Sequence, residues 1–230
     1  MRIATLEDAC VESPAASGLS FVRAMHGRVS VSDRVALRLR LREQRRALPA
    51  VKRITAAEAL ADRLLALPFA PEAGFVAGYW ASDGEIALHA WQLGLPPDCT
   101  YCLPVLHDDG GLRFAPWRPG GALVANRFGI PEPQVEPSQL LRPEQLTLAV
   151  VPLVGFDTCG HRLGMGGGWY DRSFAFRNGQ TAPPWLVGAA FSLQQLPALP
   201  REAWDVPLDA ICTEDAMHLP ADLAPDSDPA

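Results

Sequence analysis

A glycine-rich segment in the second half of the chain holds the residues best suited to chemistry. Residues 152–172 read PLVGFDTCGHRLGMGGGWYDR, with four glycines among positions 164–168. Backbone N–H groups of such a loop can converge on one concavity, and a following helix and Arg162 would add positive potential. This pattern suits phosphate binding, although glycine loops also serve as plain strand–helix turns. Trp169 occupies the last glycine position of GxGxxG, so a dinucleotide fingerprint is not supported.

Two aspartates are candidates for binding a cation near this loop. Asp171 falls in the first turn of the helix predicted from Trp169, where a carboxylate either complements the helix dipole or binds Mg²⁺. Mg²⁺ usually takes one or two protein carboxylates together with substrate phosphates. Asp209, at the start of the last predicted strand, is a candidate second ligand. Spacing alone does not bring the two carboxylates together.

An arginine stripe marks the first predicted helix, residues 33–48, for which Ser32 or Asp33 would be the N-cap. Its apolar residues form an adjoining stripe that can dock on a core. Glu43 is the only acid between Arg34 and Arg53, so intrahelical ion pairs are sparse. The stripe is therefore either a solvated charged face or a row of guanidinium groups that awaits an anion. It comprises Arg34, Arg38, Arg42, Arg45 and Arg46.

Several kinds of catalytic site are excluded or disfavoured. Lys52 is the only lysine, which excludes a P-loop and makes Schiff-base chemistry implausible. Cys99 and Cys102 lie three apart on a predicted strand, where they would face opposite sides, and we expect them to be structural. Ser82 and Ser192 lack the G-x-S-x-G motif. Nothing indicates a protein nucleophile.

Composition indicates an ordinary globular protein of 230 residues, 48% hydrophobic and 20% charged. The net charge of −6 disfavours a nucleic-acid coat or a polybasic membrane binder. No segment approaches 18 uninterrupted apolar residues, so we expect no membrane-spanning helix. The acidic start has no apolar segment typical of a secretion signal, and five cysteines is an odd number. We therefore expect a reducing, cytoplasmic setting.

Strand and helix patterns alternate along the chain, which predicts an α/β fold with a mostly parallel sheet and helices on both faces. Further helices are expected over 55–67, with Thr55 as cap, over 86–95 and from Trp169. The expected strands are 75–80, 99–106, 112–117, 146–154, 185–191 and 208–213. We expect one domain over 31–215, an N-terminal extension over 1–30 with Met25 as an alternative start, and a disordered tail over 216–230.

The glycine segment also closely resembles the signature of the 5-formyltetrahydrofolate cyclo-ligase family, also called 5,10-methenyltetrahydrofolate synthetases. Every fixed position of the pattern FD-x-x-G-x-R-L-G-x-G-x-G-[YFW]-Y-D is present. Four further elements occur in the family's order, so the resemblance covers about residues 34–213. They are RVALR (34–38), WASDGE (80–85), FGIPEP (128–133) and WDVPLD (204–209).

This resemblance implies a three-layer αβα sandwich related to the sugar-phosphate isomerases. The implied reaction is ATP- and Mg²⁺-dependent cyclisation of 5-formyltetrahydrofolate to 5,10-methenyltetrahydrofolate, with ADP and phosphate as products. The formyl oxygen attacks the γ-phosphate, and nitrogen-10 of the folate then displaces the phosphate from the activated carbon. Because the substrate supplies both nucleophiles, the protein needs only positioning and charge neutralisation. The implied partners are ATP and the folate, with no nucleic acid or membrane, for a monomer or weak dimer.

The resemblance also implies roles for individual residues. Glu85 would bond the folate near its reacting ring, and Arg162 would stabilise charge on the phosphates. Arg34 replaces the family's usual lysine, and Gly167 stands where some members carry a lysine. The metal ligands would be Asp171 and Asp209. ATP would contact Arg34, Arg38, Arg162, Leu163, Gly164, Met165, Gly166, Gly167, Gly168, Trp169 and Tyr170. The folate would contact Trp80, Glu85, Phe128, Met165 and Trp169.

Two other functions stay open at the level of sequence. The first is another ATP- or sugar-phosphate-binding enzyme on the same fold with an altered folate pocket. The second is a nucleic-acid-binding module that uses the Arg34–Arg46 stripe. The net charge of −6 and the lack of aromatic residues within the stripe disfavour the second function.

Overall fold

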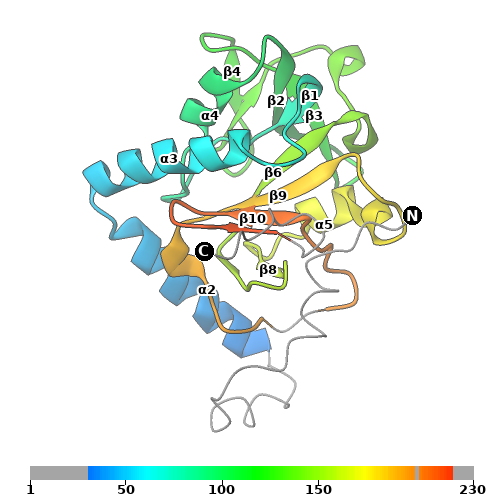
Figure 1. Cartoon of the computed structure of the whole chain (residues 1–230). Coiled ribbons are helices and arrows are strands. Elements are labelled where there is room, and N and C mark those ends of the chain that lie inside the picture. The colour runs from blue at the N-terminus through cyan, green and yellow to red at the C-terminus, as the bar shows by residue number, and fades with distance from the viewer. Residues whose placement is uncertain (1–30, 200–201, 220–230) are drawn as a thin grey trace, which may run out of the picture.

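A seven-stranded sheet forms the centre of the computed structural model, which describes residues 31–199 and 202–219 (Figure 1). The strand order is β11-β10-β9-β6-β1-β2-β3. Pairs β2–β1, β1–β6, β6–β9 and β9–β10 are parallel, and the two edge pairs are antiparallel. The strands are β1 (Ala73–Ala77), β2 (Asp98–Leu106), β3 (Leu112–Pro116), β6 (Leu148–Pro152), β9 (Trp185–Ala189), β10 (Ala210–Cys212) and β11 (Met217–His218). The predicted α/β class and mostly parallel sheet are confirmed.

Four α-helices and two small hairpins complete the part of the chain that the structure describes. The helices are α2 (Val31–Arg46), α3 (Ala50–Leu65), α4 (His89–Gly94) and α5 (Trp169–Ser173). One hairpin pairs β4 (Leu123–Ala125) with β5 (Pro131–Pro133), and the other pairs β7 (Gly155–Phe156) with β8 (Arg162–Leu163). Neither hairpin was predicted, because strands of two or three residues are too short to show a period-2 pattern.

The sheet residues alternate between two hydrophobic cores because successive side chains of a strand face opposite sides. Val76 and Val150 pack in the core with α3 and α4, whereas Ala77 and Val151 pack in the core with α5 and Phe174. Helices therefore cover both faces of the sheet, as a three-layer sandwich requires. A third, smaller cluster joins Leu41 of α2 to the β7–β8 hairpin.

Helix ends differ from the predicted ones. α2 begins at Val31, before both proposed caps, and α3 begins at Ala50 with Pro49 in the N-cap position. Thr55, predicted to cap α3, instead lies inside it and its hydroxyl donates to the carbonyl of Val51 at 3.2 Å. Proline suits the start of a helix because it has no N–H to leave unpaired there, so the helix gains a turn that the capping signal missed.

The predicted extension over 1–30 lies outside the described residues, as does most of the predicted tail. Strand β11 occupies positions 217–218 of that tail and pairs with β10. Among the described residues, no helix is both long and apolar enough to cross a membrane.

One aspartate ties α2 to the loop that follows β1. The carboxylate of Asp83 accepts hydrogen bonds from Arg42 at 2.6 Å and from Arg45 at 2.9 Å, and it also pairs with Arg46. Arg45 is fully buried and donates further to the carbonyls of Asp83 and Leu153. Three segments that are distant in sequence are thus joined at one buried cation.

Replacing Asp83 with Ala should lower the free energy of unfolding by about 3–5 kcal/mol, because Arg45 would remain buried without its carboxylate. Chemical denaturation would measure the loss. Asp109→Ala is the matched control, because it removes an exposed partner of Arg113 and should cost at most about 1 kcal/mol. Equal losses of unfolding free energy in the two variants would contradict the view that the contacts of Asp83 contribute more to stability than an exposed ion pair does.

Candidate active site

The glycine loop, residues 164–168, connects β8 to α5 and has an unusual backbone. Gly166 and Gly168 have positive φ angles, 98° and 66°, which glycine adopts without strain. None of the five backbone N–H groups of the loop donates a hydrogen bond to another described residue. Met165, Gly166 and Gly167 are exposed. Within the described part of the chain the loop therefore presents N–H donors without a partner, as the binding of an anion requires.

Two arginines hold the loop by its carbonyl oxygens. Arg38 of α2 donates from Nε to the carbonyl of Gly164 at 2.8 Å, and Arg172 of α5 donates to the carbonyl of Gly167 at 2.8 Å. A Cβ placed on Gly166 would lie 3.5 Å from Cζ of Arg38, so this guanidinium lies directly against the loop. Arg38, which is predicted to contact the phosphates of ATP, thus lies against the loop that is predicted to bind them. Arg172 was missed, although it directly follows the signature.

The remaining arginines of the stripe have acidic partners from elsewhere in the chain. Arg34 lies 3.4 Å from Glu202 and 3.5 Å from Asp205, and its Nε is buried with no hydrogen-bond partner among the described residues. Arg42, Arg45 and Arg46 contact Asp83. The stripe is thus neither a solvated face nor a free row of cations.

Arg162 forms a buried ion pair with Asp171 and also donates to the carbonyl of Val206. The same carboxylate oxygen of Asp171 accepts from the backbone N–H of Val206 at 3.3 Å. The side chain of Asp171 is 25% exposed and its other oxygen has no hydrogen bond to a described residue. The second oxygen of Asp171, Oδ2, thus has no hydrogen-bond partner among the described residues, in a residue that lies three positions after the glycine loop.

Asp209 has a different environment. Both of its oxygens contact Arg177, at 2.8 and 2.9 Å, and one also accepts from the backbone N–H of Leu186 at 2.7 Å. Burial raises the pKa of this carboxyl, and Arg177 opposes the rise. Within the described ranges, no group of three or more His, Cys, Asp or Glu side chains could hold a metal ion. Asp171 fits a Mg²⁺ completed by phosphates, whereas Asp209 would first have to leave Arg177.

Glu85 lies in a buried cluster behind the Asp83 turn. Its carboxylate accepts from the Ser82 N–H at 3.0 Å and lies 3.7 Å from Arg45. Burial raises the pKa of Glu85, opposed by the Ser82 N–H and by Arg45. Burial raises the pKa values of Tyr79 and Tyr170. The nearby negative charge of Glu85 raises both pKa values further. A carboxyl in such a site is suited to bonding the polar edge of a ring.

The predicted folate walls form exposed aromatic pairs. Phe128, at the tip of the β4–β5 hairpin, meets Trp169 edge to face at 6.3 Å between ring centroids. Trp80 meets Trp117 in the same way at 5.8 Å. Phe128, Met165 and Trp80 are 58%, 50% and 37% exposed, which suits side chains that cover a ligand. Among these five residues, the sequence analysis missed only Trp117.

Trp169 is also stacked by two cations. The guanidinium carbons of Arg127 and Arg172 lie 5.0 and 5.1 Å from its ring centroid. Arg127 has no hydrogen bond or ion pair with another described residue, and nothing in its spacing marked it in the sequence. The hairpin tip thereby places an uncommitted positive charge beside the glycine loop.

The turn between β7 and β8 is closed by a buried aspartate. Asp157 accepts from the N–H groups of Cys159 and His161 through one oxygen, and from Leu199 through the other. The imidazole Nδ1 of His161 lies 3.0 Å from that second oxygen. This hydrogen bond to Asp157 is the main cause of the raised pKa of His161, and burial opposes it.

The raised pKa of His161 predicts a pH-dependent stability. The protonated form gains from Asp157 only in the folded state, so the stabilisation is complete below pH about 6.5 and is lost as the pH rises through the folded pKa. Relative to the wild type, His161→Gln should therefore lose more unfolding free energy at pH 6 than at pH 8.5 in urea denaturation. His89→Gln, at an exposed position of α4, is the control. A difference for His161→Gln that does not change with pH would contradict this interpretation.

Comparisons with known proteins agree with this geometry. The model of the 5-formyltetrahydrofolate cyclo-ligase family matches residues 30–214. The Escherichia coli K12 5-formyltetrahydrofolate cyclo-ligase is 36% identical over 180 residues, which cover 75% of this chain and 96% of that protein. The Haemophilus influenzae 5-formyltetrahydrofolate cyclo-ligase is 36% identical over 184 residues, or 78% of this chain and 97% of the relative.

A solved structure supports the same assignment. The NMR structure of Aquifex aeolicus 5,10-methenyltetrahydrofolate synthetase has a TM-score of 0.69 and 28% identity, and the match covers 86% of this chain and 99% of that one. The family match spans six of the seven strands of the sheet, all except β11, together with the glycine loop and Glu85. The chain therefore belongs to the 5-formyltetrahydrofolate cyclo-ligase family.

Proposed function

We propose that the glycine loop binds the phosphates of ATP and that a folate lies between Glu85 and the exposed aromatic pairs, where the family reaction takes place. The observation that carries this proposal is the set of N–H groups over residues 164–168, which have no partner among the described residues, in a loop whose carbonyls at Gly164 and Gly167 are held by Arg38 and Arg172. Oriented backbone donors of this kind stabilise charge without needing to reorganise.

The arginines around the loop divide two tasks. Arg34 and Arg38 belong to α2 and would contact the phosphates directly. Arg34 would have to leave its ion pair with Glu202 in order to do so. Arg162 would act mainly through Asp171, since two of its guanidinium nitrogens are already bonded. Arg127 and Arg172 flank Trp169 and would keep its ring in place as a wall of the site.

A magnesium ion would be held by the free oxygen of Asp171 together with phosphate oxygens. When bound, it would neutralise part of the charge that develops on the transferred phosphoryl group. Asp209 would be a second ligand only after release from Arg177.

Glu85 and the aromatic side chains would position the folate. A raised pKa allows the Glu85 carboxyl to donate or accept a hydrogen bond at the polar edge of the pterin. Trp80, Phe128, Met165 and Trp169 would exclude water from the formyl group, which protects the phosphorylated intermediate from hydrolysis. The formyl oxygen bonds to the γ-phosphorus as ADP leaves, and nitrogen-10 then bonds to the formyl carbon as phosphate leaves.

Replacing Asp171 with Asn should lower Mg²⁺-dependent formation of the methenyl product by about 100-fold or more, because the metal ligand loses its charge. The absorbance of the methenyl product, followed with and without Mg²⁺, measures the effect. Chemical denaturation of Asp171→Asn separates loss of the metal from misfolding, since the substitution also weakens the ion pair with Arg162. Full activity of Asp171→Asn would remove this residue from the metal site.

Replacing Gly166 with Val should weaken ATP binding about tenfold or more. A β-branched side chain is strained at a φ of 98° and would lie against Arg38, which distorts the loop. Isothermal titration calorimetry with a non-hydrolysable ATP analogue measures the affinity. Gly179→Ala is the matched control, because its φ is not positive and its Cβ would meet nothing within 4 Å. Unchanged affinity of the Val variant would rule out the loop as the phosphate site.

A further inference from the structure

The tip of the β4–β5 hairpin is a tight turn whose shape is fixed by one asparagine. The carbonyl of Asn126 accepts from the N–H of Gly129 at 2.8 Å, which closes the turn, and Gly129 has a φ of 74°. The side-chain oxygen of Asn126 also accepts from the N–H groups of Phe128 and Ile130, at 2.8 and 3.1 Å. Arg127 and Phe128 are therefore the two central residues of a well-defined turn, and both are exposed.

A glutamate joins this turn to the central sheet. The carboxylate oxygen Oε1 of Glu132 accepts from the side-chain amide of Asn126 at 2.8 Å. The same oxygen accepts from the N–H of Leu106, the last residue of β2, at 2.9 Å. Through these two side chains the end of a sheet strand sets the position of the Arg127 backbone.

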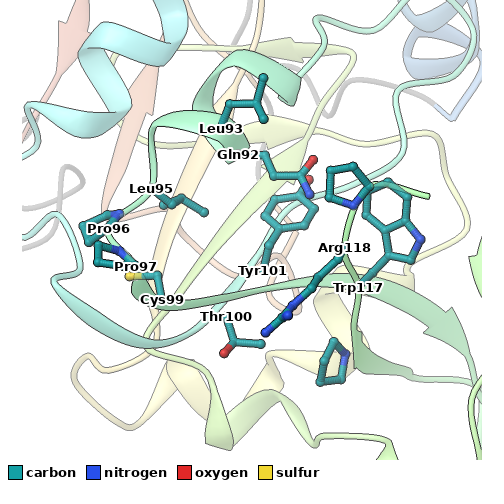
Figure 2. Close-up of a pocket in the computed structure, with 12 residues that line it drawn as sticks. Gln92, Leu93, Leu95, Pro96, Pro97, Cys99, Thr100, Tyr101, Trp117 and Arg118 are labelled. Carbon is teal, nitrogen blue, oxygen red and sulfur yellow. The ribbon is translucent and has the colours of Figure 1, made fainter. Parts of the chain in front are cut away.

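The segment that leads from β3 into the hairpin, residues 117–122, borders a cavity. The cavity has a volume of about 460 Å³ and lies between this segment, the end of α4 and the first half of β2 (Figure 2). Arg118 is the only charged residue among those that line it. The segment closes on itself, since Trp117 Nε1 donates to the carbonyl of Gly121 at 3.2 Å and the Gly121 N–H donates to the carbonyl of Arg118 at 2.8 Å. Positioning of the tip therefore falls to the β5 side of the hairpin, where Glu132 bonds to β2.

Arg127 has a guanidinium that lies over aromatic rings. Its Cζ is 5.3 Å from the ring centroid of Phe128 and 5.0 Å from that of Trp169. Within the described ranges, no hydrogen bond or ion pair joins this guanidinium to another residue. A guanidinium over an aromatic face keeps its N–H groups, which lie in its own plane, available to an oxyanion. Arg127 can therefore stay over Trp169 and bond a phosphate oxygen at the same time.

Arg127 also lies where the two proposed ligands meet. Trp169 directly follows the glycine loop, which would hold the phosphates of ATP, and its ring meets Phe128 as a proposed wall of the folate site. A cation over both rings is thus placed between the phosphates and the folate. Arg38 and Arg172 already donate to carbonyls of the loop. Arg127 offers an uncommitted guanidinium at the point where the phosphoryl group would pass from ATP to the formyl oxygen.

We propose that Arg127 is a further catalytic residue, which contacts the γ-phosphate of ATP from the hairpin tip; this proposal rests on the proposed function. The formyl oxygen forms a bond to the γ-phosphorus while the bond from that phosphorus to the bridging oxygen of ADP breaks. The bridging oxygen leaves with the electron pair, and no proton moves to or from Arg127. The guanidinium stabilises the negative charge on the transferred phosphoryl oxygens. Asn126 and Glu132 are positioning residues that act through the turn.

The first test measures equilibrium binding of a non-hydrolysable ATP analogue and of ADP, each in the presence of 5-formyltetrahydrofolate. Arg127→Ala should bind the analogue about tenfold more weakly than the wild type, as expected for one lost charge-assisted hydrogen bond. It should bind ADP, which has no γ-phosphate, as the wild type does. Arg127→Lys should recover part of the affinity for the analogue, because the charge remains. Arg40→Ala, at an exposed position of α2, is the matched control and should bind both nucleotides normally.

The second test separates catalysis from a merely structural contact with Trp169. In Arg127→Ala, kcat for the methenyl product should fall about 100-fold, the size typical of one lost donor to a developing charge. Guanidinium chloride, at concentrations that do not unfold the protein, should restore part of this kcat and should not raise kcat of the wild type. Asn126→Ala should also lower kcat, without any response to guanidinium, because Arg127 is still present but displaced.

Three results would overturn the proposal: equal weakening of the analogue and of ADP in Arg127→Ala, wild-type affinity of that variant for both nucleotides, or a wild-type kcat. Absence of methenyl product from the wild-type protein would instead count against the proposed function. The comparison of the analogue with ADP would still decide in that case whether Arg127 contacts the γ-phosphate.

Discussion

The buried contact between Asp83 and three arginines of α2 is the constraint on which the rest of the site depends. It fixes α2 against the turn after β1, and Arg45 extends the contact to the carbonyl that follows β6. Glu85 is two residues from Asp83, and Arg38 is one helical turn from Arg42. The same contact therefore sets the positions of Glu85 and Arg38 relative to each other. Because Arg45 is completely buried, the arrangement leaves little freedom for α2 to shift.

The glycine loop shows how the fold prepares a binding surface from the backbone alone. Its carbonyls at Gly164 and Gly167 accept hydrogen bonds from arginines of two different helices, while its N–H groups donate to no residue that the structure describes. A side chain would be strained at Gly166 and Gly168, where φ is positive, and would collide at Gly167, where a Cβ would lie 2.8 Å from the Trp169 ring. The loop is thus held open by its neighbours rather than by its own residues. This explains why a chain with one lysine can still offer a phosphate site.

Charged side chains and aromatic side chains lie on two different parts of the proposed site. Cations surround the glycine loop, whereas the surface that leads from Trp80 to Trp117 is aromatic and ends at the lone cation of the cavity. Under the proposed function the aromatic surface would hold the flat pterin of the folate, and the glycine loop would hold the phosphates of ATP. The alternative of a nucleic-acid-binding stripe is not favoured, because the family match covers residues 30–214 and the stripe arginines are bonded within the chain.

The sequence by itself determined the fold class, the places of the main sheet-forming segments along the chain, and the family. These depend on local signals: apolar runs, Gly-rich turns and a signature of contiguous residues. It also identified the glycine loop, Asp171, Glu85 and the aromatic walls as site candidates. The sequence did not predict the partners of the charged residues, because these pairs form between positions that are distant along the chain. Arg34 and Glu202 are 168 positions apart, and Arg42 and Asp83 are 41 apart. Only the tertiary structure decided that the arginine stripe is held by loop carboxylates, that Asp209 is bound to Arg177, and that Arg118 faces a cavity next to Trp80.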